Sequence, residues 1–271
     1  MTTPWIIYGT AWKRDTTTRM VEMALDKGFV GIDTANQAKH YSEPLVGVAL
    51  KKLLASGAPR EKFFIQTKFT QVDGQDHRLP YDPKADINTQ VLQSFKSSLE
   101  HLGVSYLDSY LLHGPYHNPG LGDEDWQVWS TLESLYQEKK VKRIGISNVN
   151  AGQLAVLIAD AEVKPMVVQN RCFARTGWDW AVRQLCREHN IMYQGFSLLT
   201  ANPGAVGHPF TESIAERLEV TAEQVIFAFA REIGMTPLTG TTNADHMQQD
   251  LDALSINLSA EEVSQLEQVE R

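Results

Sequence analysis

The sequence has few of the features that mark several large classes of protein. Its 271 residues include two cysteines, Cys172 and Cys186. Two cysteines give no disulfide framework, so we expect them to be small buried residues of a protein from a reducing compartment. No apolar run approaches the roughly 18 residues of a membrane helix. The N-terminus lacks a charged segment followed by a long apolar one, so we expect no signal peptide, no membrane contact and a cytoplasmic location.

Charge and motif content exclude further classes. The chain has 25 Lys and Arg against 33 Asp and Glu, a formal net charge of -8. No Lys/Arg cluster is interleaved with aromatic residues, so a nucleic-acid partner is not expected. No His, Cys, Asp or Glu cluster has the spacing of metal ligands, so we predict no metal site. The G-x-S-x-G motif of serine hydrolases is missing as well.

What the sequence does contain is a regular alternation of short apolar runs and helical patterns. The expected strands are residues 5–8, 29–32, 63–68, 107–112, 141–146, 166–168, 191–196 and 235–238. The expected helices are residues 16–27, 42–54, 87–102, 124–140, 151–161, 180–189, 210–218, 222–233, 244–254 and 260–269. Eight strands that are each followed by a helix predict a (β/α)₈ TIM barrel, as one domain over residues 1–271.

An open, doubly wound sheet has the same alternation and is the main competitor. Two features favour the barrel. Polar residues follow nearly every expected strand, and the segment GTAWKR after the first strand is not the glycine-rich fingerprint of a dinucleotide-binding sheet. In a barrel, these polar residues meet at one mouth, because the C-terminal ends of all strands face the same side.

Four of these residues form a coherent set for proton transfer: Asp33, Tyr41, Lys68 and His113. A tyrosine is a poor acid near neutrality because its ordinary pKa is about 10. A neighbouring ammonium such as Lys68 should lower that pKa, and Asp33 would hold the ammonium in place. His113 could donate a hydrogen bond to a substrate oxygen. Such a set suits protonation of a developing alkoxide, as in carbonyl reduction.

Six segments then make a family resemblance specific. They are GIDTA at 31–35, HYSEPLVG at 40–47, IQTKF at 65–69, DSYLLHGP at 108–115, KVKRIGISN at 140–148 and VVQN at 167–170. In this order they resemble the aldo-keto reductases over essentially the whole chain. The resemblance implies a monomeric barrel that uses NADPH to reduce a small aldehyde or ketone. It makes Tyr41 the proton donor and Asp33, Lys68 and His113 its catalytic partners.

The resemblance also implies where the cofactor and the substrate bind. The carboxamide of the nicotinamide falls to Ser147, Asn148 and Gln169, and Phe196 stacks on its ring. The remaining cofactor contacts are Gly9, Thr10, Ser197, Leu199, Thr239, Gly240, Thr241, Thr242, His246, Gln249 and Asp250. The expected walls of the substrate pocket are Trp12, Phe173 and Trp178.

The chain departs from the family pattern at three places. Ala38 stands at the usual spacing of the tyrosine, so the loop before Tyr41 must bulge. Gly240 and His246 replace a Lys and an Arg beside the 2′-phosphate, which makes NADH an alternative cofactor, because glycine offers no charge-assisted bond. Gly114 follows the catalytic histidine where a tryptophan is usual, and the chain stops soon after its last helix, so we expect an open site.

Other interpretations stay open at this stage. Asp33 could cap a turn, Tyr41 could be a half-buried aromatic residue, and His113 could be a core histidine. At the level of function, the alternatives are a non-catalytic nicotinamide-binding barrel that regulates a partner, and a different barrel enzyme such as an isomerase. The first predicts tight cofactor binding without turnover, and the second predicts no nicotinamide affinity.

Overall fold

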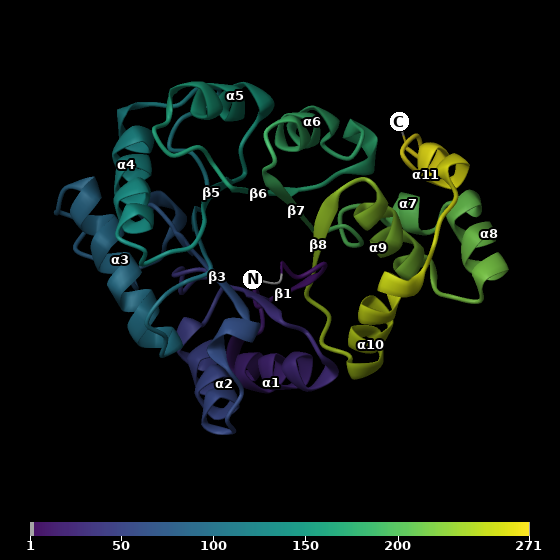
Figure 1. Cartoon of the computed structure of the whole chain (residues 1–271), viewed down its shortest axis with the longest axis horizontal. Coiled ribbons are helices and arrows are strands. Elements are labelled where there is room, and N and C mark those ends of the chain that lie inside the picture. The colour runs from purple at the N-terminus through teal and green to yellow at the C-terminus, as the bar shows by residue number, and fades with distance from the viewer. Residues whose placement is uncertain (1–2, 271) are drawn as a thin grey trace.

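Parallel strands pair in chain order around a closed barrel, which Figure 1 shows end-on in a computed structural model that describes residues 3–270. The strands are β1 (Ile7–Gly9), β2 (Gly31–Asp33), β3 (Phe64–Phe69), β4 (Ser109–Leu112), β5 (Ile144–Ser147), β6 (Val167–Arg171), β7 (Met192–Phe196) and β8 (Met235–Thr239). The barrel closes where Tyr8 of β1 pairs with Thr239 of β8. The predicted (β/α)₈ barrel is therefore confirmed, and the open sheet is ruled out.

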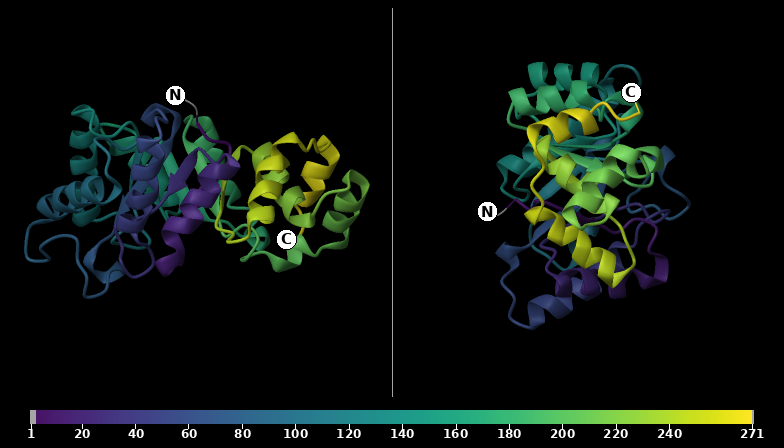
Figure 2. Two further views of the ribbon diagram at one scale, coloured as in Figure 1. Left: turned by 90° about the horizontal axis from the view of Figure 1, so that it is seen from below. Right: turned by 90° about the vertical axis from the view of Figure 1, so that its right-hand side faces the viewer.

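Helices surround the barrel and shield its outer face. They are α1 (Thr17–Lys27), α2 (Glu43–Ala55), α3 (Ile87–Leu102), α4 (Asp123–Gln137), α5 (Ala151–Asp160), α6 (Trp180–Glu188), α9 (Ala222–Glu232) and α10 (Ala244–Asp252). Three further helices, α7 (Pro203–Val206), α8 (Pro209–Leu218) and α11 (Ala260–Leu266), stand with α9 on one side of the barrel, green to yellow in Figure 2.

Local sequence signals explain the ends of these elements, as α3 illustrates. Asp86 precedes the helix and its side chain accepts a hydrogen bond from Thr89 N, which satisfies one of the free N–H groups of the first turn. Gly103 ends the helix in the left-handed conformation, with φ 66°, which glycine adopts without steric cost. Val91 and Phe95 face the barrel and are buried. The spacing of the apolar residues, the N-terminal cap and the C-terminal glycine thus all agree with the observed limits of α3.

The predicted strand ranges were shifted at several places. The second strand was expected over residues 29–32, but β2 runs over Gly31–Asp33, so that Asp33 is the last strand residue and pairs with Gly9. Hydrophobicity marks where a chain is buried, whereas the ladder of hydrogen bonds decides where a strand begins. Phe29 is buried before the ladder starts, which is why the apolar run was misleading.

Two layers make up the interior. A large apolar core lies between the strands and the helices, and a small cluster of Ile7, Phe64 and Leu238 is separate from it, with half-buried Phe196 packed against that cluster. Buried polar side chains from β2, β3, β6 and β7 gather as well: Asp33, Gln66, Lys68, Gln169 and Gln194. Burying so many polar groups is costly unless they bind one another.

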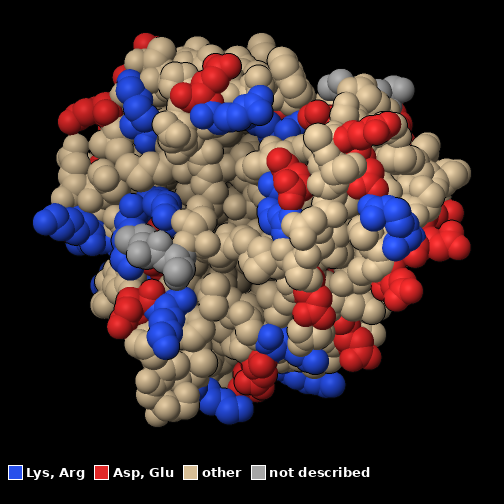
Figure 3. Space-filling view, turned by 45° about the vertical axis from the view of Figure 1, so that its right-hand side comes forward, with Lys and Arg blue, Asp and Glu red and all other residues tan. Residues whose placement is uncertain are grey.

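In the part of the chain that the structure describes, no helix combines the length and the apolarity needed to cross a membrane. On the face shown in Figure 3, basic and acidic side chains are interspersed among other residues.

The contact between α2 and α3 depends on a glycine. A Cβ atom on Gly47 would lie 1.8 Å from the backbone oxygen of His101 and 3.1 Å from the Cα of Leu102. We expect Gly47→Ala to reduce the free energy of unfolding by about 1–3 kcal/mol, because the two helix backbones must separate. Urea denaturation measures the change. Gly120→Ala is the matched control, since a Cβ there meets open space. Equal midpoints for the two variants would contradict the prediction.

Candidate active site

A buried ion pair lies at the centre of the barrel mouth. Lys68 Nζ is 2.7 Å from each carboxylate oxygen of Asp33 and 2.9 Å from the backbone oxygen of Thr34. Lys68 is 0% exposed and Asp33 is 2% exposed. All three ammonium hydrogens therefore have acceptors, which a buried charge requires. Burial lowers the pKa of Lys68, and the charge of Asp33 beside it acts in the opposite direction.

Two glutamines hold the carboxylate of Asp33, and a third glutamine, Gln194, accepts hydrogen bonds from both of them. Gln66 Nε2 donates to Asp33 Oδ1 at 2.7 Å, and Gln169 Nε2 donates to the same oxygen at 3.0 Å. Both amides also donate to Gln194 Oε1, at 2.7 and 2.9 Å. The sequence analysis missed Gln66 and Gln194. The signal for Gln66 was its position two residues before Lys68, which places both side chains on the same face of β3.

Tyr41 reaches this site through a compact turn. The backbone N of His40 and of Tyr41 both donate to the oxygen of Gln37, at 3.2 and 3.0 Å. The turn takes up the additional residues of the loop and brings Tyr41 to the start of α2. Lys68 Nζ lies 5.4 Å from the centre of the Tyr41 ring, and the ring of His113 is 6.0 Å away at an angle of 66°. The four predicted catalytic side chains thus lie together.

The effect of Lys68 on Tyr41 differs from the prediction. We expected the ammonium to lower the pKa of the phenol, but burial raises that pKa and the charge of Asp33 raises it further. Burial disfavours the charged phenolate, and the carboxylate of Asp33 repels its negative charge. Tyr41 consequently holds its proton at neutral pH and has one to give.

His113 follows β4 and is neutral at physiological pH. Burial lowers its pKa to about 3, with smaller contributions from the charges of Lys68 and His40. Its Nδ1 lies 2.6 Å from the hydroxyl of Thr70, the residue after β3. Its backbone N donates to the oxygen of Phe69 at 2.9 Å. The ring is therefore held between two neighbouring strand ends.

The residues predicted around the nicotinamide carboxamide lie at the end of β5, directly after it and within β6. Ser147 Oγ donates to the backbone oxygen of Gln169 at 2.6 Å, and Asn148 Nδ2 donates to the backbone oxygen of His113 at 2.8 Å. Asn148 is exposed and has a left-handed backbone, with φ 54°. Gln169 points into the barrel, where it binds Asp33. Phe196 is half-buried at the end of β7, and the guanidinium of Arg171 lies 5.5 Å from its ring centre.

The remaining predicted cofactor residues lie at or just after the ends of β1, β7 and β8, and on α10. Thr10 Oγ1 donates to the backbone oxygen of Asp33 at 3.0 Å, and Thr239 Oγ1 donates to Asp250 Oδ2 at 2.6 Å. Burial raises the pKa of Asp250 to about 6. Gln249 accepts a bond on its backbone oxygen from Gln224. The others on this rim are Gly9, Ser197, Leu199, Gly240, Thr241, Thr242 and His246.

Lys13 is a charged rim residue that the sequence analysis did not select. Its ammonium donates to the backbone oxygens of Gly240 at 2.5 Å and Ala11 at 3.2 Å, and its side chain is 9% exposed. Within residues 3–270 it has no carboxylate partner. Burial lowers its pKa. A cation thus stands beside Gly240, where the sequence predicted that a phosphate contact was lost.

The three residues predicted to line the substrate pocket differ in their exposure and contacts. Trp12 is 64% exposed, and its ring centre lies 4.0 Å from that of His40, next to Tyr41. Phe173 is half-buried with the guanidinium of Arg175 over its ring. The prediction for Trp178 was wrong, because its side chain is 1% exposed and packs against Phe229 in the core.

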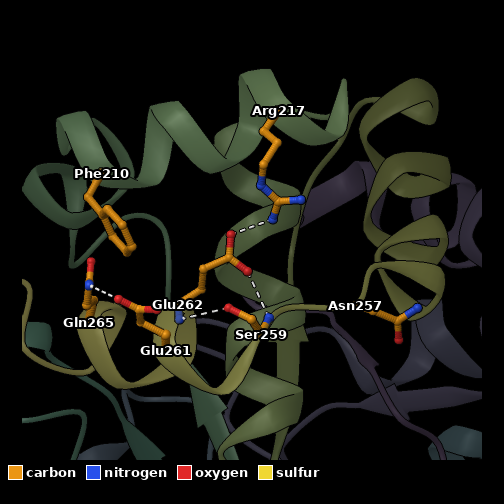
Figure 4. Close-up of a pocket in the computed structure, with 7 residues that line it drawn as sticks. All are labelled: Phe210, Arg217, Asn257, Ser259, Glu261, Glu262 and Gln265. Atoms are coloured by element: carbon orange, nitrogen blue, oxygen red, sulfur yellow. Dashed lines mark hydrogen bonds and ion pairs between the residues drawn. The ribbon is translucent and has the colours of Figure 1, made fainter.

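A hollow elsewhere on the molecule contains none of the predicted site residues. It has a volume of about 450 Å³ and lies between α8 and α11 (Figure 4). Glu262 accepts hydrogen bonds from the guanidinium of Arg217 and from the backbone N of Ser259 there, and Glu261 accepts one from the amide of Gln265. Its charged groups are therefore occupied by one another. Across residues 3–270, no three His, Cys, Asp or Glu side chains are grouped as metal ligands.

Comparison with known proteins decides the family. The family model described as Aldo/keto reductase family matches residues 4–204. The chain belongs to this family. It is 30% identical over 250 residues to the glyoxal reductase of Bacillus subtilis, covering 92% of this chain and 82% of that protein. It is 28% identical over 253 residues to the NADPH-dependent alpha-keto amide reductase of Saccharomyces cerevisiae, covering 88% of this chain and 74% of that protein.

Solved structures agree with this assignment. The crystal structure of an aldo-keto reductase from a deep-sea metagenome library superposes with a TM-score of 0.84 at 26% sequence identity. The match covers 99% of this chain and 92% of that one. As an aldo/keto reductase, the protein is an NAD(P)H-dependent oxidoreductase that acts in carbonyl reduction.

The neutral state of His113 predicts a pH dependence of stability. The folded protein takes up this proton only near pH 3, whereas an unfolded histidine takes it up near 6.5. Between these values the unfolded state binds more protons, so stability is lost as the pH falls. Urea unfolding between pH 4 and 7 measures the slope of the free energy of unfolding against pH. We expect this slope to be smaller in His113→Gln, by up to the amount that corresponds to one proton.

His77→Gln removes an exposed histidine and serves as the control for this measurement. The control should keep the slope of the wild-type protein. A wild-type slope in His113→Gln would contradict the burial of an uncharged ring at this position.

Proposed function

We propose that this aldo/keto reductase reduces aldehydes or ketones to alcohols with Tyr41 as the proton donor. The observation that carries the proposal is the arrangement of a protonated phenol beside a neutral imidazole, above a fully buried Lys–Asp pair. Each of these groups can take one role in carbonyl reduction. A phenol that keeps its proton at neutral pH can give it to a developing alkoxide, and a neutral imidazole can donate to an oxygen without competing for the proton.

The residues of the rim suit a nicotinamide cofactor. Phe196 offers an aromatic ring at the mouth, and the exposed amide of Asn148 can bind a carboxamide. Lys13 is a buried ammonium whose partners are two backbone carbonyls, so an anionic phosphate would complement it. Together with the family, these features support NADPH. When bound, this cofactor supplies the hydride for the carbonyl carbon.

The protein's own groups account for the other half of the reaction. His113 binds the carbonyl oxygen and places it near the phenol of Tyr41. As negative charge develops on that oxygen, Tyr41 transfers its proton, and the ammonium of Lys68 stabilises the phenolate that remains. Asp33 keeps Lys68 charged in a site that excludes water. Exposed Trp12 and half-buried Phe173 support substrates with an apolar or aromatic substituent.

We expect Tyr41→Phe to reduce turnover at least 100-fold, because it removes the proton that the alkoxide needs. Turnover is measured as oxidation of NADPH with a panel of aldehydes and ketones, and binding of NADPH as quenching of intrinsic fluorescence. The dissociation constant of NADPH should stay within about twofold. Tyr116→Phe is the matched control, because it makes the same change after β4, and within residues 3–270 its hydroxyl has no hydrogen-bond partner.

Near-normal turnover in Tyr41→Phe would remove Tyr41 as the donor and make His113 the next residue to test. Tight NADPH binding by the wild-type protein with no turnover on the whole panel would instead favour a non-catalytic cofactor-binding protein.

The ammonium of Lys13 should contribute to the binding of the cofactor. We expect Lys13→Met to weaken NADPH binding about tenfold and to reduce its sensitivity to salt, because a charge-assisted bond to a phosphate is lost. Titrations with NADPH and with NADH at two salt concentrations measure this effect. Lys84→Met removes an exposed loop lysine and serves as the control.

Comparison of the two cofactors then locates the ammonium. A loss for NADPH alone places Lys13 at the 2′-phosphate, and an equal loss for both cofactors places it at the diphosphate that they share. Unchanged affinity for both cofactors would contradict any role of Lys13 in phosphate binding.

A further inference from the structure

Thr70 lies between the loop that follows β3 and the imidazole of His113. Thr70 directly follows β3 and is 3% exposed. Its hydroxyl lies 2.6 Å from His113 Nδ1, and within residues 3–270 it has no other hydrogen-bond partner. His113 Nε2 has no partner among the same residues. The two ring nitrogens of His113 are therefore in different situations, one held by the protein and one free.

The hydroxyl determines which ring nitrogen carries the hydrogen. A neutral imidazole has one N–H, and a hydroxyl has one hydrogen of its own to place. If Nδ1–H donated to Thr70, the buried hydroxyl hydrogen would have no acceptor, which is costly. The favourable arrangement has Thr70 Oγ1 donating to Nδ1, so that the ring hydrogen is on Nε2. The free nitrogen is then a hydrogen-bond donor.

The loop after β3 holds Thr70 in the orientation that this bond requires. Tyr81 OH and Gln75 Nε2 donate to the backbone oxygen of Thr70, at 2.7 and 3.2 Å. A Cβ atom on Gly74 would lie 2.6 Å from Thr70 Cγ2, so the methyl group of Thr70 fits closely against this glycine. With the methyl group on that side, the hydroxyl faces His113.

We propose that Thr70 is a positioning residue that keeps His113 in the Nε2–H form, so that the ring donates to the carbonyl oxygen of the substrate. The inference rests on the proposed role of His113 in carbonyl binding. Without the hydroxyl, the Nδ1–H form becomes accessible, and the lone pair of Nε2 then faces the substrate oxygen. That form repels the carbonyl and misplaces it relative to Tyr41.

The test compares Thr70→Val, which keeps the shape and removes the hydroxyl, with Thr70→Ser, which keeps the hydroxyl. The first readout is ¹⁵N NMR of histidine-labelled protein without cofactor, with His113→Gln used to assign the signal. We expect an N–H at Nε2 and an unprotonated Nδ1 in the wild-type protein and in Thr70→Ser. We expect a mixture of both forms in Thr70→Val.

The second readout is steady-state reduction of a carbonyl substrate. Thr70→Val should lower kcat by about 10- to 100-fold, as misplacement of a reacting group does, whereas Thr70→Ser should stay within about twofold. Both variants should bind NADPH as the wild-type protein does, which shows that the barrel is intact.

The outcomes separate this inference from the proposed function. An unchanged NMR signature in Thr70→Val overturns the inference, and so does a changed signature with unchanged kcat. If the wild-type protein reduces no carbonyl on the panel, the proposed function fails and the positioning role fails with it, even where the NMR shows hydrogen on Nε2.

Discussion

The ion pair between Lys68 and Asp33 is the constraint on which the site depends. A buried ammonium and a buried carboxylate are each expensive, and removal of one partner leaves the other without compensation. The protein meets this cost by giving every hydrogen of Lys68 an acceptor and by surrounding Asp33 with glutamine amides. Burial raises the pKa of Tyr41 beside this pair, and the charge of Asp33 raises it further, so the phenol keeps its proton.

Much of the fold could be predicted from the sequence, because hydrophobic alternation reports burial directly. The alternation of strands and helices and the barrel were predicted correctly. Strand limits such as Gly31–Asp33 were not, since they depend on pairing with a neighbouring strand. Trp178 shows a second limit: its loop position indicated the mouth, but the chain turns inward there and buries the ring against Phe229. The side to which a loop residue points depends on tertiary packing.

The site shows the same division. Asp33, Tyr41, Lys68 and His113 were predicted as a set because their chemistry suits proton transfer and three of them stand at expected strand ends. Thr70 and Lys13 were missed, because a threonine or a lysine in a loop has no signal until its partners are known. The direction of the pKa shift of Tyr41 was also beyond the sequence. It depends on how far the phenol is buried and on the nearness of Asp33, and both are decided by the folded chain.

The network around Asp33 also bears on how such a barrel could be divided or assembled. Its members come from β2, β3, β6 and β7, so residues from both halves of the chain hold one carboxylate. A half-barrel that ended after β4 would contain Asp33, Tyr41, Lys68 and His113 and yet lack Gln169 and Gln194. All four residues predicted for catalysis would be present, but the carboxylate of Asp33 would lack the hydrogen bond from Gln169. The arrangement around Asp33 is therefore a property of the closed barrel, because both halves of the chain contribute to it.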